Sequence, residues 1–69
     1  MYIIIELQSY NDGTLGHIVQ TASDINEANS KYHQVLAAAA ISQVPVHACT
    51  LLDRDGLQIK CETYHHDVV

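Results

Sequence analysis

The sequence contains no tryptophan and no phenylalanine, so its apolar mass consists mainly of isoleucine, leucine, valine and alanine. The hydrophobic core must therefore be built of small side chains. Sixty-nine residues make a single domain, and a chain of this length buries only about 60% of the surface that its unfolded form exposes. Because 48% of the residues are hydrophobic and only 16% are charged, we expect the chain to gain stability by binding a copy of itself.

Positive charge is scarce as well. Lysine and arginine number three against eight aspartates and glutamates, which gives a formal net charge of −5. Such a chain has no basic stripe to neutralise phosphates, so neither nucleic acid nor an anionic membrane is an expected partner. No signal-peptide pattern is present, and the longest apolar run, residues 35–41, is far shorter than the ~20 residues that span a bilayer. We expect a cytoplasmic protein.

Cysteine occurs twice, at Cys49 and Cys61, which is too few for a secreted disulfide scaffold. Together with His47 these thiols offer zinc-ligand chemistry, but their spacing matches no recognised finger or ribbon, and we expect no metal and no cofactor. The sequence also lacks the G-x-S-x-G, P-loop and dinucleotide-binding motifs. Asp53 and Asp55 flank Arg54 in a turn, where aspartate commonly caps the backbone. We therefore do not expect an enzyme.

The order of the elements follows from periodicity and turn residues. Asp24 and Glu27 form a capping box at the start of a helix that we predict over residues 25–42. Alternating or β-branched runs predict strands over 2–10, 15–22, 46–52 and 57–64, with an Asp-Gly hairpin on each side of the helix. The predicted fold is α+β: a single ββαββ domain, residues 1–69, in which one helix packs on one face of a four-stranded antiparallel sheet.

Three-residue turns that end in glycine would fix the pairing of the strands. The first turn aligns Leu7 with His17, and the second aligns Leu51 with Ile59, Cys49 with Cys61 and His47 with Thr63. On this register we expect Tyr2, Ile4, Ile18, Ala48 and Leu52 on the sheet face away from the helix, together with Glu6, Lys60 and Glu62. That face is too apolar to be left wholly in water, which predicts at least a dimer.

Four consecutive alanines leave the helix almost without side chains. Ala39 lies in the apolar stripe that faces the sheet, and its three neighbours cover the other directions. One interpretation is helix propensity with a close helix–sheet contact. The other is close approach by a second copy or by a flat ligand, which the position of Ile41 favours. On the second interpretation the residues at the oligomer interface are Ala37, Ala38, Ala40, Ile41 and Ile4.

Polar groups on this otherwise apolar helix are the best candidates for binding. The predicted ligand-binding residues, which include an aromatic ring and an arginine from outside the helix, are Lys31, His33, Gln34, Ser42, Tyr2 and Arg54. A twofold interface on the alanines would duplicate these groups and could form a small polar-rimmed pocket. The alternative is that they are solvated surface residues and that Tyr32 belongs to the core.

Four stretches stand out along the chain: M-Y-I-I-I-E-L-Q, N-D-G, Y-H-x-V-L-A-A-A-A-I-S and D-x-D-G-L. Together they resemble a family of small proteins encoded by phages and prophages of gut Firmicutes, and the similarity spans nearly the whole chain. The resemblance implies a phage-borne protein that acts in the cytoplasm of a bacterial host. It transfers no catalytic residue.

Small oligomeric phage proteins without enzymatic activity fall into two classes. A counter-defence sponge sequesters a nucleotide immune signal, such as a cyclic oligonucleotide or a cyclic ADP-ribose species, in pockets between subunits. A structural or assembly accessory, or an inhibitor, instead binds a host or phage protein. The alanine-rich helix and the absence of catalytic motifs favour the sponge. The net charge counts against it, because an anionic ligand would depend on Lys31, Arg54 or Lys60, on histidines, and on backbone N–H groups.

Overall fold

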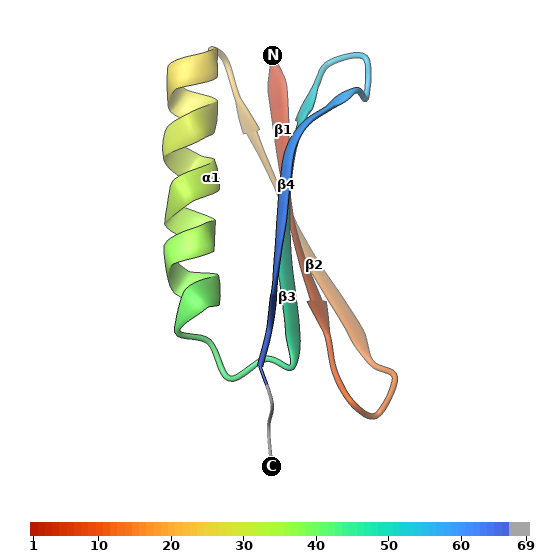
Figure 1. The fold of residues 1–69 in the computed structure, drawn as a ribbon. Helices are drawn as coiled ribbons and strands as arrows, with labels where there is room; N and C mark the ends of the chain where they lie inside the picture. The colour runs from red at the N-terminus through yellow and green to blue at the C-terminus, as the bar shows by residue number, and fades with distance from the viewer. Residues whose placement is uncertain (67–69) are drawn as a thin grey trace.

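The computed structural model describes residues 1–66 and has two layers, a sheet and one helix (Figure 1). The elements in chain order are β1 (Tyr2–Ser9), β2 (Leu15–Ala22), α1 (Ile25–Ala40), β3 (Val46–Asp53) and β4 (Gln58–His65). The strands form one antiparallel sheet in the order β2-β1-β3-β4, which places β2 and β4 at its edges. The predicted α+β fold of four antiparallel strands and one helix is confirmed. Within residues 1–66, no helix is long and apolar enough to cross a membrane.

The predicted turns and the predicted helix start are confirmed. Gly13 and Gly56 have φ angles of 90° and 85°, a region that glycine enters without steric cost. The Asp24 carboxylate accepts a hydrogen bond of 2.8 Å from the backbone N–H of Glu27, as a helix cap does. The helix ends at Ala40, two residues earlier than predicted, where the Ser42 hydroxyl accepts a 3.0 Å bond from the N–H of Val44 and the chain turns towards Pro45.

The register of the first hairpin is as predicted, with Leu7 opposite His17, but that of the second hairpin is wrong beyond its turn. Leu52 pairs with Gln58 and Leu51 pairs with Lys60, so Ile59 is an extra, bulged residue in β4. Since successive side chains of a strand point to opposite faces, one extra residue reverses the faces of all that follow. Cys61 therefore lies opposite Thr50 on the face away from α1, not opposite Cys49. Lys60 and Glu62 move to the helix side.

The predicted faces of β1 and β2 are also wrong. Ile4 is 1% exposed and belongs to the core under α1, so it cannot contact a second copy, and Tyr2 packs against the same core. Glu6 and Ile18, which pair with each other, share this helix side. The cause is that β1 begins with an uninterrupted apolar run, residues 2–5, so the alternation that would define a buried face is missing there.

The core lies between α1 and the two central strands. The largest fully buried side chains are Ile4, Cys49 and Leu51 from the sheet, and the helix contributes Ala28, Tyr32, Val35, Leu36 and Ala39. Ala39 has no exposed surface, as predicted for the sheet-facing stripe, and it lets α1 approach the sheet closely. Ala37, Ala38 and Ala40 are exposed, so the predicted contact of a second copy with them stays a prediction.

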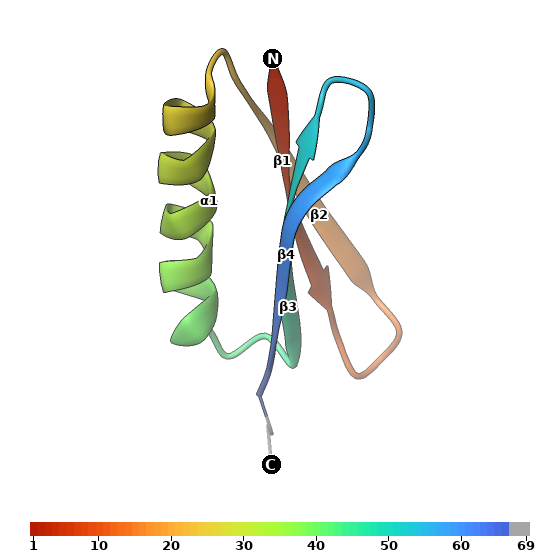
Figure 2. The ribbon, with the colours of Figure 1, turned by 45° about the horizontal axis from the view of Figure 1, so that its top comes forward.

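The second face of the sheet, here called the open face, is turned away from α1, and no described helix lies on it (Figure 2). Register and alternation give it four side chains from each strand. They are Ile3, Ile5, Leu7 and Ser9 of β1; Leu15, His17, Val19 and Thr21 of β2; Val46, Ala48, Thr50 and Leu52 of β3; and Gln58, Cys61, Thr63 and His65 of β4.

Candidate ligand-binding groove

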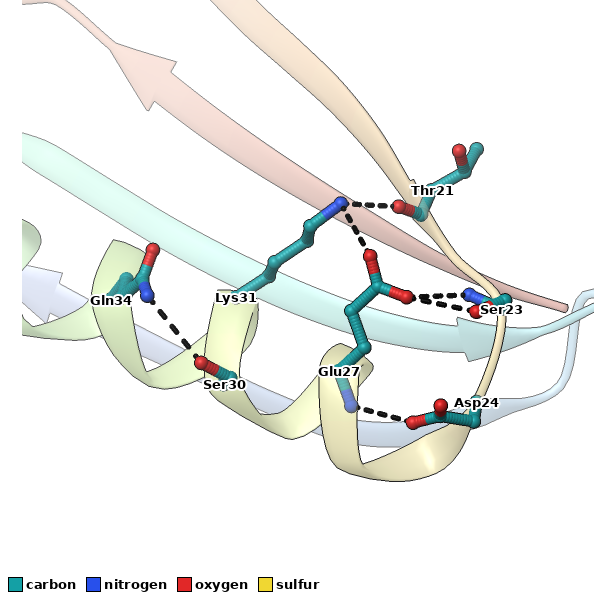
Figure 3. A network of polar contacts seen from close by, with 7 residues as sticks. All are labelled: Thr21, Ser23, Asp24, Glu27, Ser30, Lys31 and Gln34. Atoms are coloured by element: carbon teal, nitrogen blue, oxygen red, sulfur yellow. Dashed lines mark hydrogen bonds and ion pairs between the residues drawn. The ribbon is translucent and has the colours of Figure 1, made fainter.

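Two of the predicted ligand-binding residues are engaged along α1 (Figure 3). The Lys31 ammonium donates a 2.6 Å hydrogen bond to the carbonyl oxygen of Thr21 and forms an ion pair of 3.3 Å with Glu27. The Gln34 amide donates to the hydroxyl of Ser30 one turn earlier, at 3.4 Å. Lys31 thus ties α1 to the end of β2, and its charge is compensated within the chain.

The other predicted residues are dispersed. Tyr2 and Arg54 line a small hollow of about 300 Å³, where Asp53 and Asp55 add two carboxyl groups that would repel an anion. Ser42 lies after the other end of α1, where its hydroxyl serves the loop backbone. One chain therefore does not bring the six predicted residues together. His33 differs from the rest, because it lines a separate cavity beside β4.

That cavity is an open groove of about 740 Å³ between α1 and β4. It exists because β4 is an edge strand and α1 packs chiefly on β1 and β3. We call it the α1–β4 groove. Its helix side is formed by Tyr32, His33, Leu36, Ala37 and Ala40, and its strand side by Ile59, Lys60, Cys61, Glu62 and Tyr64.

Lys60 places a positive charge in this groove. Its ammonium donates a 2.9 Å hydrogen bond to the side-chain oxygen of Asn29 and lies 5.8 Å from the centre of the Tyr32 ring. Both partners are uncharged, and within residues 1–66 Lys60 forms no ion pair with a carboxylate. The charge of Lys60 is thus available to a ligand, unlike that of Lys31. The sequence placed Lys60 on the other face, because nothing in it reveals the bulge at Ile59.

Aromatic rings occupy the helix wall of the groove and its end near the C-terminal ends of α1 and β4. The rings of Tyr32 and His33 lie edge to face, with centroids 5.6 Å apart and an interplanar angle of 78°. Tyr64 stacks on His66 at 6.3 Å, and an imidazole nitrogen of His66 lies 2.7 Å from the carbonyl oxygen of Ala39, which joins the ends of β4 and α1. Burial raises the pKa of Tyr32, so its hydroxyl stays protonated at neutral pH. Tyr32 is only 4% exposed, so the rings open to a flat ligand are the exposed His33 and the half-buried Tyr64.

Glu62 gives the same groove a negative charge. Its side chain lies on the helix side of β4, two residues after Lys60. The charged side chains of the groove therefore cancel, and a ligand with several negative charges meets one carboxylate as well as one ammonium.

The remaining candidate chemistry lies in the core. A nitrogen of the buried His47 ring is 2.5 Å from the Glu6 carboxylate, next to Cys49. Burial, with the nearby Glu6 and Cys61 charges, raises the pKa of the Cys49 thiol to about 11, which disfavours the thiolate that metals and electrophiles require. Within residues 1–66 no cluster of three or more histidine, cysteine or acidic side chains could hold a metal ion.

No protein-family model matches the chain, and no curated protein or solved structure is significantly similar to it. The α1–β4 groove and the open face are the surfaces of the described chain that suggest a function.

Proposed function

We propose that the protein is a non-enzymatic binding protein that sequesters a small, flat, anionic ligand of the nucleotide class in the α1–β4 groove. The single observation that carries the proposal is the ammonium of Lys60, which forms no ion pair with a described carboxylate and lies beside the Tyr32 ring, in a groove of about 740 Å³. In the phage setting implied by the sequence resemblance, removal of a nucleotide immune signal would act as a counter-defence.

The size and the lining of the groove fit a purine-containing ligand. Ligand sites of about 300–1,000 Å³ are typical for small molecules, and stacking of a base on an aromatic ring contributes roughly 1–3 kcal/mol. His33 and Tyr64 lie on opposite walls, so a base held between α1 and β4 would meet rings from both elements. A phosphate near Lys60 would accept a charge-assisted hydrogen bond.

One chain supplies both walls of the groove, so the proposed site differs from the pocket between subunits that the sequence suggested. Of the six residues proposed from the sequence, His33 remains in the site, and Lys60 takes the place of Lys31 as the charged group.

Lys60→Ala tests the site against its matched control, Lys31→Ala. Both variants remove one lysine from the same chain, but only Lys60 faces the groove. In calorimetric titrations with cyclic dinucleotides and cyclic ADP-ribose, we expect Lys60→Ala to weaken binding about tenfold or more, and Lys31→Ala to leave it within about twofold. Equal affinities of the two variants, or no binding of any of these nucleotides to the unmodified chain, would reject the proposal.

Glu62→Gln tests the same site in the opposite direction. The substitution keeps the length of the side chain and removes a negative charge from the groove, so an anionic ligand should bind several-fold more tightly, a gain of about 1 kcal/mol. The same titrations measure this gain, and it should shrink in high salt because salt screens exposed charges. An unchanged or weaker affinity would place the anion away from β4.

Binding of a host or phage protein is the second candidate, and the edge of β4 favours it. β4 pairs only with β3, so within the described residues its outer edge has no strand beside it and could accept an extended segment of a partner. Lys60, Glu62 and the bulge at Ile59 weigh against this, because charges and bulges are devices that protect edges from pairing. If the purified chain retained a host or phage protein and bound no nucleotide, protein binding would be the supported function.

A further inference from the structure

The open face is distinguished by its lack of formal charge. Within residues 1–66, none of its sixteen side chains is an aspartate, glutamate, lysine or arginine. The whole chain carries eleven such residues, three basic and eight acidic. The charged residues inside the strands all lie on the helix side, and they are Glu6, Asp53, Lys60 and Glu62.

The apolar side chains of the open face are concentrated on the two central strands. β1 and β3 contribute Ile3, Ile5, Leu7, Val46, Ala48 and Leu52. Most of the polar side chains lie on the edge strands, among them His17 of β2 and Thr63 of β4. A hydrophobic centre with a polar rim is the arrangement of protein–protein interfaces.

Large apolar groups of this face are uncovered in the single chain. Leu7 is 44% exposed, Val19 is 55% exposed and Leu15 is 75% exposed, although a protein of this size has few large apolar residues to spare. The polar group in the middle of the face is already satisfied, since the Thr50 hydroxyl donates a hydrogen bond of 3.3 Å to the sulfur of Cys61. Covering the face therefore leaves no central donor unpaired.

We infer that the open face binds the open face of a second copy of this chain, in a twofold-symmetric sandwich of two sheets. The acidic net charge favours this face as the site where two copies meet. Two chains of formal charge −5 repel each other wherever charged surfaces come together, whereas this face brings no formal charge into the contact. A twofold contact also requires a surface that complements itself, and an apolar face does so without matched charges.

The area of the face reaches the minimum for a specific dimer. Four strands of eight residues, about 4.8 Å apart and rising about 3.3 Å per residue, cover roughly 500 Å² in projection. Two copies then bury about 1,000 Å², which is the lower bound for a specific interface. The buried area is larger once the uneven surface of the side chains is included. Aligned sheets pack in this manner about 10 Å apart.

This contact differs from the one predicted from the alanines of α1. Ala37, Ala38 and Ala40 lie in the other layer of the molecule, and their small side chains offer little apolar area. The α1–β4 groove is also on the helix side, so the dimer leaves it accessible. Loss of the dimer and loss of the ligand are therefore separate outcomes.

Val19→Lys and Ala38→Lys form a matched pair of variants. Each adds one lysine at an exposed position, the first on the open face and the second on the outer side of α1. In sedimentation equilibrium we expect a dimer for the unmodified chain and for Ala38→Lys. For Val19→Lys we expect a monomer with a dissociation constant raised about a hundredfold or more, because an ammonium would be buried without a partner. Circular dichroism verifies that each variant is folded, and Leu7→Lys replaces Val19→Lys if the latter unfolds.

Alkylation of Cys61 in the unmodified chain gives a second readout that needs no substitution. Cys61 is exposed on the rim of the open face, whereas Cys49 is buried. We expect its alkylation rate by iodoacetamide to fall as the protein concentration rises, since the dimer shields the thiol. The inference would be overturned by a monomer at every concentration or by a folded open-face lysine variant that still dimerises. It would also be overturned if Ala38→Lys alone caused dissociation, or if the alkylation rate did not depend on protein concentration.

Discussion

At the scale of single residues, the pair of His47 and Glu6 shows what the core requires. The His47 ring is buried between the sheet and α1, and its second nitrogen, Nδ1, has no hydrogen-bond partner within the described residues. The contact of 2.5 Å to Glu6 is therefore the one polar interaction of the ring, and the Glu6 side chain is itself only 15% exposed. Breaking such a pair lowers the stability of the fold, because removing one member leaves the other in a water-poor environment without the contact between them.

His47→Ala should lower the free energy of unfolding by about 3 kcal/mol, since among the described residues it leaves the largely buried Glu6 carboxylate with the 3.0 Å hydrogen bond from the Gln8 amide in place of two partners. Glu6→Gln keeps the length of the side chain and an oxygen that accepts from the imidazole, so its cost should be about 1 kcal/mol. Urea denaturation at a fixed protein concentration measures both. Equal costs for the two variants would mean that the pair is not what holds Glu6.

Single residues also explain where the sequence misled. Gly13 and Gly56 identified both turns, because only a few turn types use glycine at positive φ, and the register of the first hairpin follows directly. The bulge at Ile59 has no comparable signal, since an isoleucine fits a regular strand equally well. That one residue moved Lys60 into the groove and Cys61 out of the core, and with them the candidate site.

At the scale of elements, α1 is fixed at its first turn by a network that the sequence did predict in part. Besides the Asp24 cap, the Glu27 carboxylate accepts hydrogen bonds of 3.1 Å and 3.0 Å from the backbone and the hydroxyl of Ser23 (Figure 3). These bonds, followed by the contact with Lys31, lower the pKa of Glu27 below its ordinary value of 4.5. The folded chain thus stabilises the charged form of the Glu27 carboxylate relative to its protonated form.

Glu27 should make stability depend on pH in a defined direction. Because its pKa is lower in the folded chain than in the unfolded chain, its contribution is fully present above about pH 4.5 and is lost as the pH falls through the folded-state value. Thermal unfolding of the unmodified chain and of Glu27→Gln should therefore differ near neutral pH and converge in acid. Curves that stay equally separated down to about pH 3 would contradict this assignment.

The strands show how far a pattern can define a face. β3 carries its core residues at alternate positions, with Cys49 and Leu51 towards α1, as the sequence indicated. β1 is apolar at consecutive positions, so both of its faces satisfied the pattern, and the choice was decided by where the helix packs. Because β1 is apolar on both of its faces, Ile4 lies in the core while Ile3 and Ile5 lie on the open face.

At the scale of the whole molecule, α1 covers one face of the sheet, and the other face has an apolar centre and no formal charge among the described residues. The groove lies on the covered side. A dimer through the open face would join two α1–β4 grooves that point away from each other. The sequence predicted the elements and the need for a second copy, which stays a prediction. It could not predict strand order, which depends on how β3 adds to β1 across a separation of some forty residues.

If the chain dimerises, its apparent stability must follow mass action. Unfolding coupled to dissociation shifts the midpoint of thermal denaturation upwards as the protein concentration rises. We expect this shift in the unmodified chain and in Ala38→Lys, and no shift in Val19→Lys, by differential scanning calorimetry over a wide concentration range. A midpoint independent of concentration in all three chains would exclude a dimer that stabilises the fold.

Sequestration of a nucleotide is tested most directly by native mass spectrometry of the protein, purified gently from cells that are producing a cyclic nucleotide immune signal. We predict the mass of a dimer with one additional small molecule per chain, released on mild denaturation and absent from Lys60→Ala. A ligand-free protein, isolated while the same cells demonstrably contain the signal, would contradict the claim that the α1–β4 groove sequesters it.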